Sequence, residues 1–167
     1  MSPDAVAPTM ELIDPPTEPI RSILVPTDGS EAARAALEQA IAIATATDAT
    51  VHLLAVVPVE NPMRFDTSDL EELEEAKERL VDELVEACAD GEVHVSGAVR
   101  RGRPARAILA FAEETDVDLI VLGRTGRDGI AAPLLGSTTD RVLRATTIPV
   151  MVLPQVVGEG PDAPGRA

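Results

Sequence analysis

The sequence is poor in aromatic residues and in cysteine: its 167 residues include two phenylalanines, no tryptophan, no tyrosine and one cysteine. A single cysteine excludes an intramolecular disulfide. Because 45% of the residues are hydrophobic, a core can still form, but it must be built from aliphatic side chains. The length fits one domain, since typical domains hold about 100–200 residues.

Long apolar runs are also missing. No stretch approaches the roughly 18 apolar residues that identify a membrane-spanning helix. The first twenty residues lack both the basic start and the continuous apolar centre of a signal peptide. The sequence therefore predicts a cytoplasmic protein that has no membrane partner.

Basic residues are scarce, and lysine most of all. The chain has 14 basic residues, of which Lys77 is the only lysine, against 29 acidic ones, and its net charge is −15. Such a surface repels nucleic acid and anionic membranes, so we exclude both as partners. The excess acid favours a halophilic origin, because a salt-rich cytoplasm screens the repulsion. The alternative is a GC-rich genome, which favours arginine over lysine.

The pattern along the chain divides it into three parts. Residues 1–20 and 155–167 carry prolines and acids without periodicity, and both are expected to be disordered. Between them, the segment 21–154 alternates short apolar runs with amphipathic stretches. Strands are expected at 21–25, 51–57, 93–99, 117–122 and 150–153. Helices are expected after Ser30, which would cap the first one, and at 70–88, 103–115 and 137–145.

This alternation predicts an α/β fold, a doubly wound parallel five-stranded sheet with helices on both faces. The expected strand order is 3-2-1-4-5, so strands 1 and 4 are neighbours and the winding direction reverses between them. Ligands of such folds bind outside the carboxyl ends of the strands at that reversal. We therefore expect a site where Pro26, Thr27 and Asp28 lie opposite Leu122 and Gly123.

Four glycines lie between positions 123 and 136, directly after the fourth expected strand. Glycine lets backbone amides approach a phosphate closely. Gly136, Ser137 and Thr138 open an expected helix, whose first N–H groups attract anions. The alternatives are an ordinary loop for the glycines and, for Ser137, a capping box with Asp140 that engages its hydroxyl.

Several other nucleotide and metal motifs are missing from the sequence. There is no P-loop pattern, and the first turn, PTDGS, lacks the glycine fingerprint of a dinucleotide-binding protein. A receiver domain would need an acidic residue at the end of the third strand and a lysine near the fifth. The third expected strand is instead followed by Arg100 and Arg101, and the only lysine, Lys77, lies in the second expected helix. His52 and His94 are expected in strands and Cys88 in packing, and together they predict no metal site.

The spacing of the glycine stretch, G-x-x-G, nine residues, then G-S, resembles the signature of the ATP-binding members of the universal stress protein family. The segment ILVPTDGSEAARAALEQA is similar to the first strand and helix of that family, and TTIPVMVLP to its last strand. The resemblance covers about residues 21 to 154.

The resemblance implies a site for an adenine nucleotide. Val56 would offer backbone groups to the adenine. The residues beside the nucleotide at the first strand would be Pro26, Thr27 and Asp28. The residues at base, ribose and phosphates would be Leu122, Gly123, Gly126, Gly136, Ser137 and Thr138. Arg127 matches no residue of the signature; it would either reach phosphate or lie in solvent.

A carboxylate beside a polyphosphate is repulsive unless a cation lies between them. Mg²⁺ typically uses one or two carboxylates together with phosphate oxygens. Asp28 is therefore a candidate Mg²⁺ ligand, and its alternative role is that of a turn residue before the first helix. The expected cofactors are ATP and Mg²⁺.

These patterns favour an ATP-binding stress-response or regulatory protein over an enzyme, because no nucleophile–base pair emerges near the expected site. The alternatives are a slow Mg-dependent ATPase and a dimeric interaction module with an empty pocket. The apolar strand at 150–153 would be an aggregation hazard as an uncovered edge. We expect it to pair with its own copy in a homodimer, as the family resemblance also implies.

If the acidity is a halophilic adaptation, the melting temperature should rise as KCl increases from low concentration to about 1 M, where the Debye length falls to about 3 Å. The reason is screening of repulsion among acidic residues such as Glu71, Glu72, Glu74 and Glu75. Thermal melts across a KCl series measure this dependence. A melting temperature that does not change with salt would leave genome composition as the explanation.

Overall fold

The computed structural model describes residues 18–59, 61, 63, 66–124 and 135–154. The strands are β1 (Ser22–Pro26), β2 (Thr50–Pro58), β3 (Val95–Gly102), β4 (Leu119–Gly123) and β5 (Val150–Leu153). The helices are α1 (Glu31–Thr47), α2 (Thr67–Ala87), α3 (Pro104–Glu114) and α4 (Ser137–Ala145). The segment 155–167 lies outside the described residues, as does most of 1–20.

The strands form one parallel sheet in the order β3-β2-β1-β4-β5, which confirms the predicted topology. On one side of β1, Ser22 pairs with Thr50 of β2. On its other side, Ile23 pairs with Leu119 of β4. The winding direction therefore reverses at β1 and β4, as expected.

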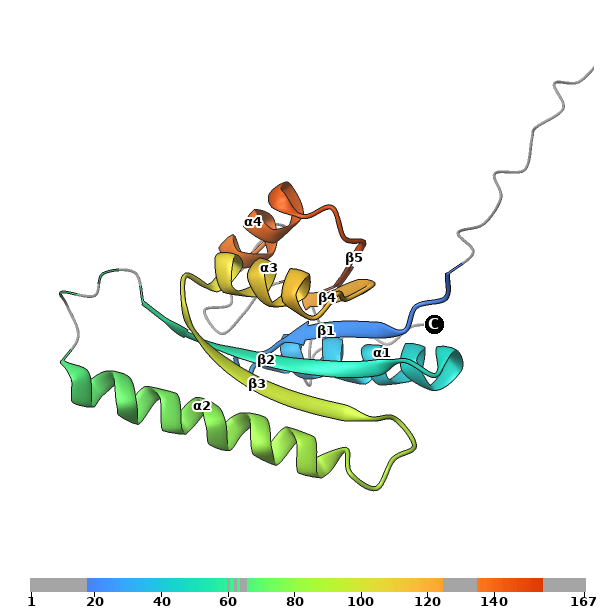
Figure 1. Cartoon of the computed structure of the whole chain (residues 1–167), viewed down its shortest axis with the longest axis horizontal. Helices are drawn as coiled ribbons and strands as arrows, with labels where there is room; N and C mark the ends of the chain where they lie inside the picture. The colour runs from blue at the N-terminus through green and yellow to red at the C-terminus, as the bar shows by residue number, and fades with distance from the viewer. Residues whose placement is uncertain (1–17, 60, 62, 64–65, 125–134, 155–167) are drawn as a thin grey trace, which may run out of the picture.

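Helices cover both faces of the sheet, and Figure 1 shows α1 and α2 on one side with α3 and α4 on the other. Because successive strand residues point to opposite faces, the strands contribute side chains to two cores, one on each face of the sheet. The core under α1 and α2 contains these buried residues: Ile23, Val25, Ala36, Leu37, Ala40, Ala44, Ala49, Val51, Leu53, Leu119 and Val121. The core under α3 and α4 contains Leu24, Leu54, Ile108, Phe111, Ala112, Val117, Ile120, Leu122 and Val142.

Local signals in the sequence explain where two helices begin. Ser30 is the N-cap of α1, and its Oγ accepts a hydrogen bond from the Ala33 N–H at 3.1 Å, as predicted. Pro104 occupies the first turn of α3, where its missing N–H has no helical partner to lose. Asp48 ends α1 in the left-handed conformation with φ 59°, which aspartate tolerates better than most residues.

The third strand begins two residues later and ends three residues later than the predicted 93–99. Pairing with β2 decides its limits, since the ladder runs from Val51 opposite Val95 to Pro58 opposite Gly102. This pairing carries Arg100 and Arg101 into the strand, although neither is apolar. His94 precedes β3, so its predicted place in a strand is wrong.

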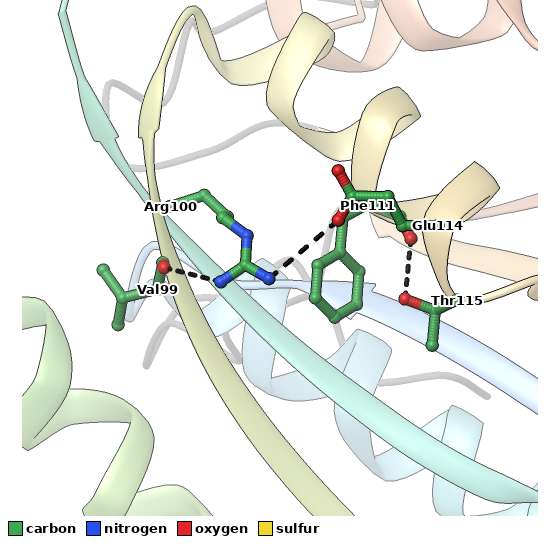
Figure 2. A network of polar contacts seen from close by, with 5 residues as sticks. All are labelled: Val99, Arg100, Phe111, Glu114 and Thr115. Atoms are coloured by element: carbon green, nitrogen blue, oxygen red, sulfur yellow. Dashed lines mark hydrogen bonds and ion pairs between the residues drawn. The ribbon is translucent and has the colours of Figure 1, made fainter.

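Figure 2 shows how α3 is attached to the edge strand β3. Arg100 extends over the ring of Phe111, with its guanidinium carbon 5.3 Å from the ring centroid. The same guanidinium donates to the Val99 carbonyl at 3.2 Å and lies 4.0 Å from the Glu114 carboxylate. Thr115 Oγ1 donates to the Phe111 carbonyl at 2.7 Å. Exposed ion pairs contribute about 0–1 kcal/mol and exposed cation–π contacts about 0.5–1 kcal/mol, so the two contacts of Arg100 are of similar strength.

His52 packs against the opposite edge of this cluster. Its ring centroid lies 6.3 Å from that of Phe111, and its Nδ1 is 2.9 Å from Ser96 Oγ. Burial, with a smaller contribution from His94, lowers the pKa of His52. The imidazole is therefore neutral near pH 7 and serves the packing of α3 on β2.

Helix α2 covers β2 and β3, and Val81 is its one buried residue. The residues predicted to point inward are half-buried: Leu70, Leu73, Leu80, Leu84 and Cys88. The sequence pattern did not identify Val81. It lies over Gly97 of β3, and a Cβ built on Gly97 would come within 2.1 Å of Val81 Cγ1.

Gly97→Ala should destabilise the protein by about 1–3 kcal/mol, the usual cost of overpacking a close contact. Val81→Ala alone should also destabilise, because it removes a buried contact. The double variant should recover part of the Gly97→Ala loss, because the shorter side chain makes room for the new methyl group. Denaturant unfolding of all four proteins gives this coupling energy, and strictly additive losses would contradict the contact.

Candidate nucleotide site

The turn between β1 and α1 is held by two hydrogen bonds within the turn and by one to β2. Thr27 Oγ1 accepts from the Gly29 N–H at 3.2 Å, and Asp28 Oδ1 accepts from the Ser30 N–H at 3.0 Å. Thr27 is buried, and its N–H donates to the Leu54 carbonyl of β2 at 2.8 Å. Gly29 has φ 82°, a conformation that favours glycine. The turn therefore fixes the Asp28 carboxylate at the carboxyl end of the sheet.

Val56 lies on the same edge but farther out. Pro26, the last residue of β1, pairs with Leu54, while β2 continues to Pro58. The Leu54 carbonyl faces β1, and the backbone groups of Val56, two residues later, face the same side. Since β1 ends at Pro26, the Val56 backbone faces the space beyond Thr27. This geometry agrees with the implied role of Val56 toward an adenine.

Leu122 and Gly123 end β4 beside this turn. Continuing the pairing of Ile23 with Leu119 places Thr27 level with Gly123, which brings the expected residues together. The Leu122 side chain is buried in the core under α3 and α4. A Cβ at Gly123 would lie 2.7 Å from Ala32 Cβ and 2.9 Å from the Ala32 carbonyl. Gly123 is therefore needed for the approach of α1 to β4, whatever its role toward a ligand.

Two hydrogen bonds attach the start of α4 to the end of β4. The Gly136 N–H donates to the Arg124 carbonyl at 2.8 Å. Thr139 Oγ1 donates to the Gly123 carbonyl at 3.0 Å, and Thr139 is buried. The two described ends of the glycine stretch, at Arg124 and Gly136, are therefore hydrogen-bonded to each other at the end of β4. Gly126 and Arg127 fall outside the described residues.

Gly136 is the N-cap of α4, and Ser137 is its first residue. The predicted capping box of Ser137 with Asp140 is therefore wrong, because Ser137 lies one position inside the helix. Asp140 is the first residue whose N–H reaches back along the helix, to the Gly136 carbonyl at 2.9 Å. No side chain among the described residues caps α4. The N–H groups of Ser137, Thr138 and Thr139 consequently have no partner within the helix.

Unpartnered N–H groups at a helix start carry partial positive charge and suit an anion; the phosphate role of this helix start stays a prediction. Gly136 has φ −59° and ψ 152°, values that any residue adopts. Its conformation therefore does not require glycine, and the missing side chain instead leaves the first turn of α4 accessible. Ser137 is exposed and Thr138 half-buried at this end of the helix.

Asp28 is the one carboxylate that the prediction assigned to a metal. Within the described ranges no group of three or more His, Cys, Asp or Glu side chains is arranged to hold a metal ion. The donors fit a Mg²⁺ ion that arrives with phosphate oxygens, because such an ion needs only one or two protein carboxylates. They do not fit an ion held by the protein alone.

The sequence analysis missed two residues that shape this site, Ala32 and Thr139. Thr139 lies two residues after Ser137, and a hydroxyl residue in the first turn of an expected helix is a signal that could have identified it. Ala32 gives no such signal, because its importance comes from a contact with Gly123. Cys88 packs against the core under α1 and α2, and burial raises the pKa of its thiol. It is a packing residue, as expected.

The chain matches known proteins along most of its length. Residues 19–154 match the model of the universal stress protein family. The chain is 35% identical over 139 residues to universal stress protein MJ0531 of Methanocaldococcus jannaschii, covering 80% of this chain and 81% of that protein.

Solved structures show the same similarity. Universal stress protein UspA from Lactobacillus plantarum superposes with a TM-score of 0.71 at 29% identity, over 82% of this chain and 99% of that one. A universal stress protein in complex with cAMP superposes with a TM-score of 0.56 at 25% identity, over 81% and 98%. None of the helices in the described part of the chain is long and apolar enough to cross a membrane. The chain belongs to the universal stress protein family.

Proposed function

We propose that this protein binds ATP at the carboxyl edge of β1 and β4 and acts as a homodimeric stress-response or regulatory protein. The observation that carries the proposal is the uncapped first turn of α4, which Thr139 and Gly136 attach to the end of β4. Backbone N–H groups at a helix start bind phosphate without any basic side chain. The cAMP complex of a related protein supports an adenine nucleotide as the ligand class.

The proposed arrangement follows the edge of the sheet. The adenine would lie against the Val56 backbone and the phosphates at Gly136, Ser137 and Thr138. Asp28, fixed by the Ser30 N–H at 3.0 Å, would contact the Mg²⁺ that accompanies the phosphates. Gly126 is a proposed phosphate contact from the sequence pattern, and Arg127, which matches no residue of that pattern, would either reach phosphate or lie in solvent.

Gly136→Val should weaken ATP binding at least tenfold, which corresponds to about 1.4 kcal/mol, because the new side chain covers the first turn of α4. The fold should remain, since the φ and ψ of Gly136 suit valine. Ala46→Val, at an exposed position on α1, is the control and should bind normally. Calorimetric titration with ATP measures the affinities. Equal affinity in wild type and Gly136→Val would refute the phosphate role of α4.

Asp28→Ala should respond differently to metal. With Mg²⁺ its affinity for ATP should fall by about tenfold, the loss of one good contact of about 1.4 kcal/mol. In EDTA its affinity should match or exceed that of wild type, because a carboxylate that repels phosphate has been removed. An equal loss under both conditions would exclude the metal-ligand role. Phosphate release from ATP in the same samples would support slow hydrolysis.

The homodimer is proposed through β5, an edge strand of the sheet. All four of its residues are apolar and half-buried in the single chain, so pairing with a second copy would cover them. Val152→Lys should convert a dimer into a monomer, while Ser68→Lys at an exposed position of α2 should not. Light scattering at working salt measures the mass. A wild-type monomer, or an unchanged Val152→Lys dimer, would contradict this interface.

A further inference from the structure

A groove of about 550 Å³ lies between α3 and α4, and none of the proposed nucleotide contacts is among its described lining residues. Its apolar lining comes from Ala105, Leu109 and Ala145, and its basic lining from Arg103, Arg106 and Arg141. Among the described residues, no acidic side chain lines it. In a chain with a net charge of −15, this concentration of positive charge is an exception.

The three guanidinium groups also lack carboxylate partners within the described residues. Arg79, Arg100, Arg101 and Arg144 all form ion pairs with carboxylates. Across the ranges that the structure describes, no such pair involves the arginines of the groove. Arginine presents a fork of N–H donors that matches a carboxylate. The groove is therefore suited to an extended segment that carries acidic and aliphatic residues together.

We propose that residues 10–14 of the same chain, Met-Glu-Leu-Ile-Asp, occupy this groove. The segment lies outside the described residues, and no basic residue occurs in the printed sequence before Arg21. Leu12 and Ile13 match the apolar lining of the groove. Glu11 and Asp14 flank them, as carboxylates must in order to meet arginines on the rim.

The chain that precedes β1 starts beside the C-terminal end of α3. The N–H groups of Arg21 and Ser22 donate to Asp118 Oδ2 at 2.8 and 3.0 Å. Asp118 follows the C-terminal end of α3, so the chain enters the sheet beside that end of the helix. At 1.5 Å per residue, Arg106 lies about 14 Å and Arg103 about 18 Å back along α3 from Thr115.

The chain before Glu18 is long enough to extend along α3. At about 3.3–3.6 Å per extended residue, the four residues back to Asp14 reach about 14 Å and the seven back to Glu11 reach about 24 Å. Ile20 packs against the core under α1 and α2, so the chain must first cross the edge of the sheet. Fully extended, the six residues back to Leu12 reach about 20 Å, against about 9 Å along α3 from Thr115 to Leu109, which leaves about 10 Å of chain for that crossing.

Intramolecular attachment makes a weak contact effective. A short flexible connection gives an effective concentration in the millimolar range, so modest individual ion pairs suffice. The ion pairs should weaken in high salt, while the contacts of Leu12 and Ile13 should not. Docking would place an acidic strip over this basic groove and over the outer side of α4.

A spin label tests the proposal on the full-length chain. Cys88→Ala with Thr9→Cys gives one attachment point for a nitroxide, just before the docking segment. The expected result is broadening of the backbone amide signals of Leu109 and Ala145, with little effect on α2. Uniform broadening over the surface, or broadening centred elsewhere, would overturn the proposal.

Charge variants separate docking from simple proximity. Arg103→Glu with Arg106→Glu should abolish the broadening, and so should Glu11→Lys with Asp14→Lys. Combining both pairs should restore it, because the charges are exchanged. The matched control, Arg34→Glu with Arg79→Glu, changes the same charge at exposed positions outside the groove and should have no effect. Broadening that survives the groove variants would overturn the proposal, and thermal melts confirm that each variant folds.

Two further samples identify the occupant. Deleting residues 155–167, which also carry acidic residues, should leave the broadening intact; its loss would assign the groove to that segment instead. A mixture of spin-labelled unenriched chains with unlabelled isotope-enriched chains should show little broadening. Broadening as strong as in the single-chain sample would overturn the intrachain assignment. None of these measurements involves a nucleotide, so they test the docking of residues 10–14 independently of the proposed ATP site.

Discussion

The pairing of β1 with β4 is the interaction on which the rest of this structure depends. It joins the two halves of the chain, with Ile23 opposite Leu119 and Leu24 opposite Ile120. Because the winding direction reverses here, α1 covers one face while α3 and α4 cover the other, and neither closes the carboxyl edge between β1 and β4. The turn at Asp28 and the start of α4 both follow from this pairing. A different neighbour for β1 would separate them.

The near absence of aromatic residues shapes the packing around that pairing. The inner face of α1 is built from Ala36, Leu37, Ala40 and Ala44, all buried, and small side chains let a helix lie close to a sheet. The approach is close enough that a Cβ on Gly123 would meet the Ala32 backbone at 2.9 Å. One glycine therefore serves the packing of α1, while Gly136, whose conformation does not require glycine, keeps the start of α4 accessible.

Periodicity predicted much of the fold, including every helix and strand that the structure describes, the parallel sheet and its strand order, because buried parallel strands are apolar throughout and the helices are amphipathic. Periodicity was least accurate where contacts between elements determine strand limits and burial. β3 extends through Arg100 and Arg101 because β2 pairs with them. Val81 is buried because Gly97 lies beneath it. The site followed the same division. The register of β1 and β4 brings Thr27 level with Gly123, as the topology predicted. The capping role of Ser137 was wrong, because the cap is one residue earlier, at Gly136.

The charge of the chain explains why its proposed ligand site is made of backbone. A surface with a net charge of −15 repels a polyphosphate at long range. A basic side chain that lies next to a carboxylate can also be drawn into an ion pair, as Arg144 is with Asp140 at 3.0 Å. The N–H groups at a helix start cannot be neutralised in this way, because their partial charge belongs to the peptide units and acts only at close range. Salt or a bound cation would reduce the long-range repulsion while leaving these short contacts intact. In the proposed function the phosphates would therefore lie on backbone amides, while the arginines in the groove between α3 and α4 would meet the acidic segment 10–14 of the same chain.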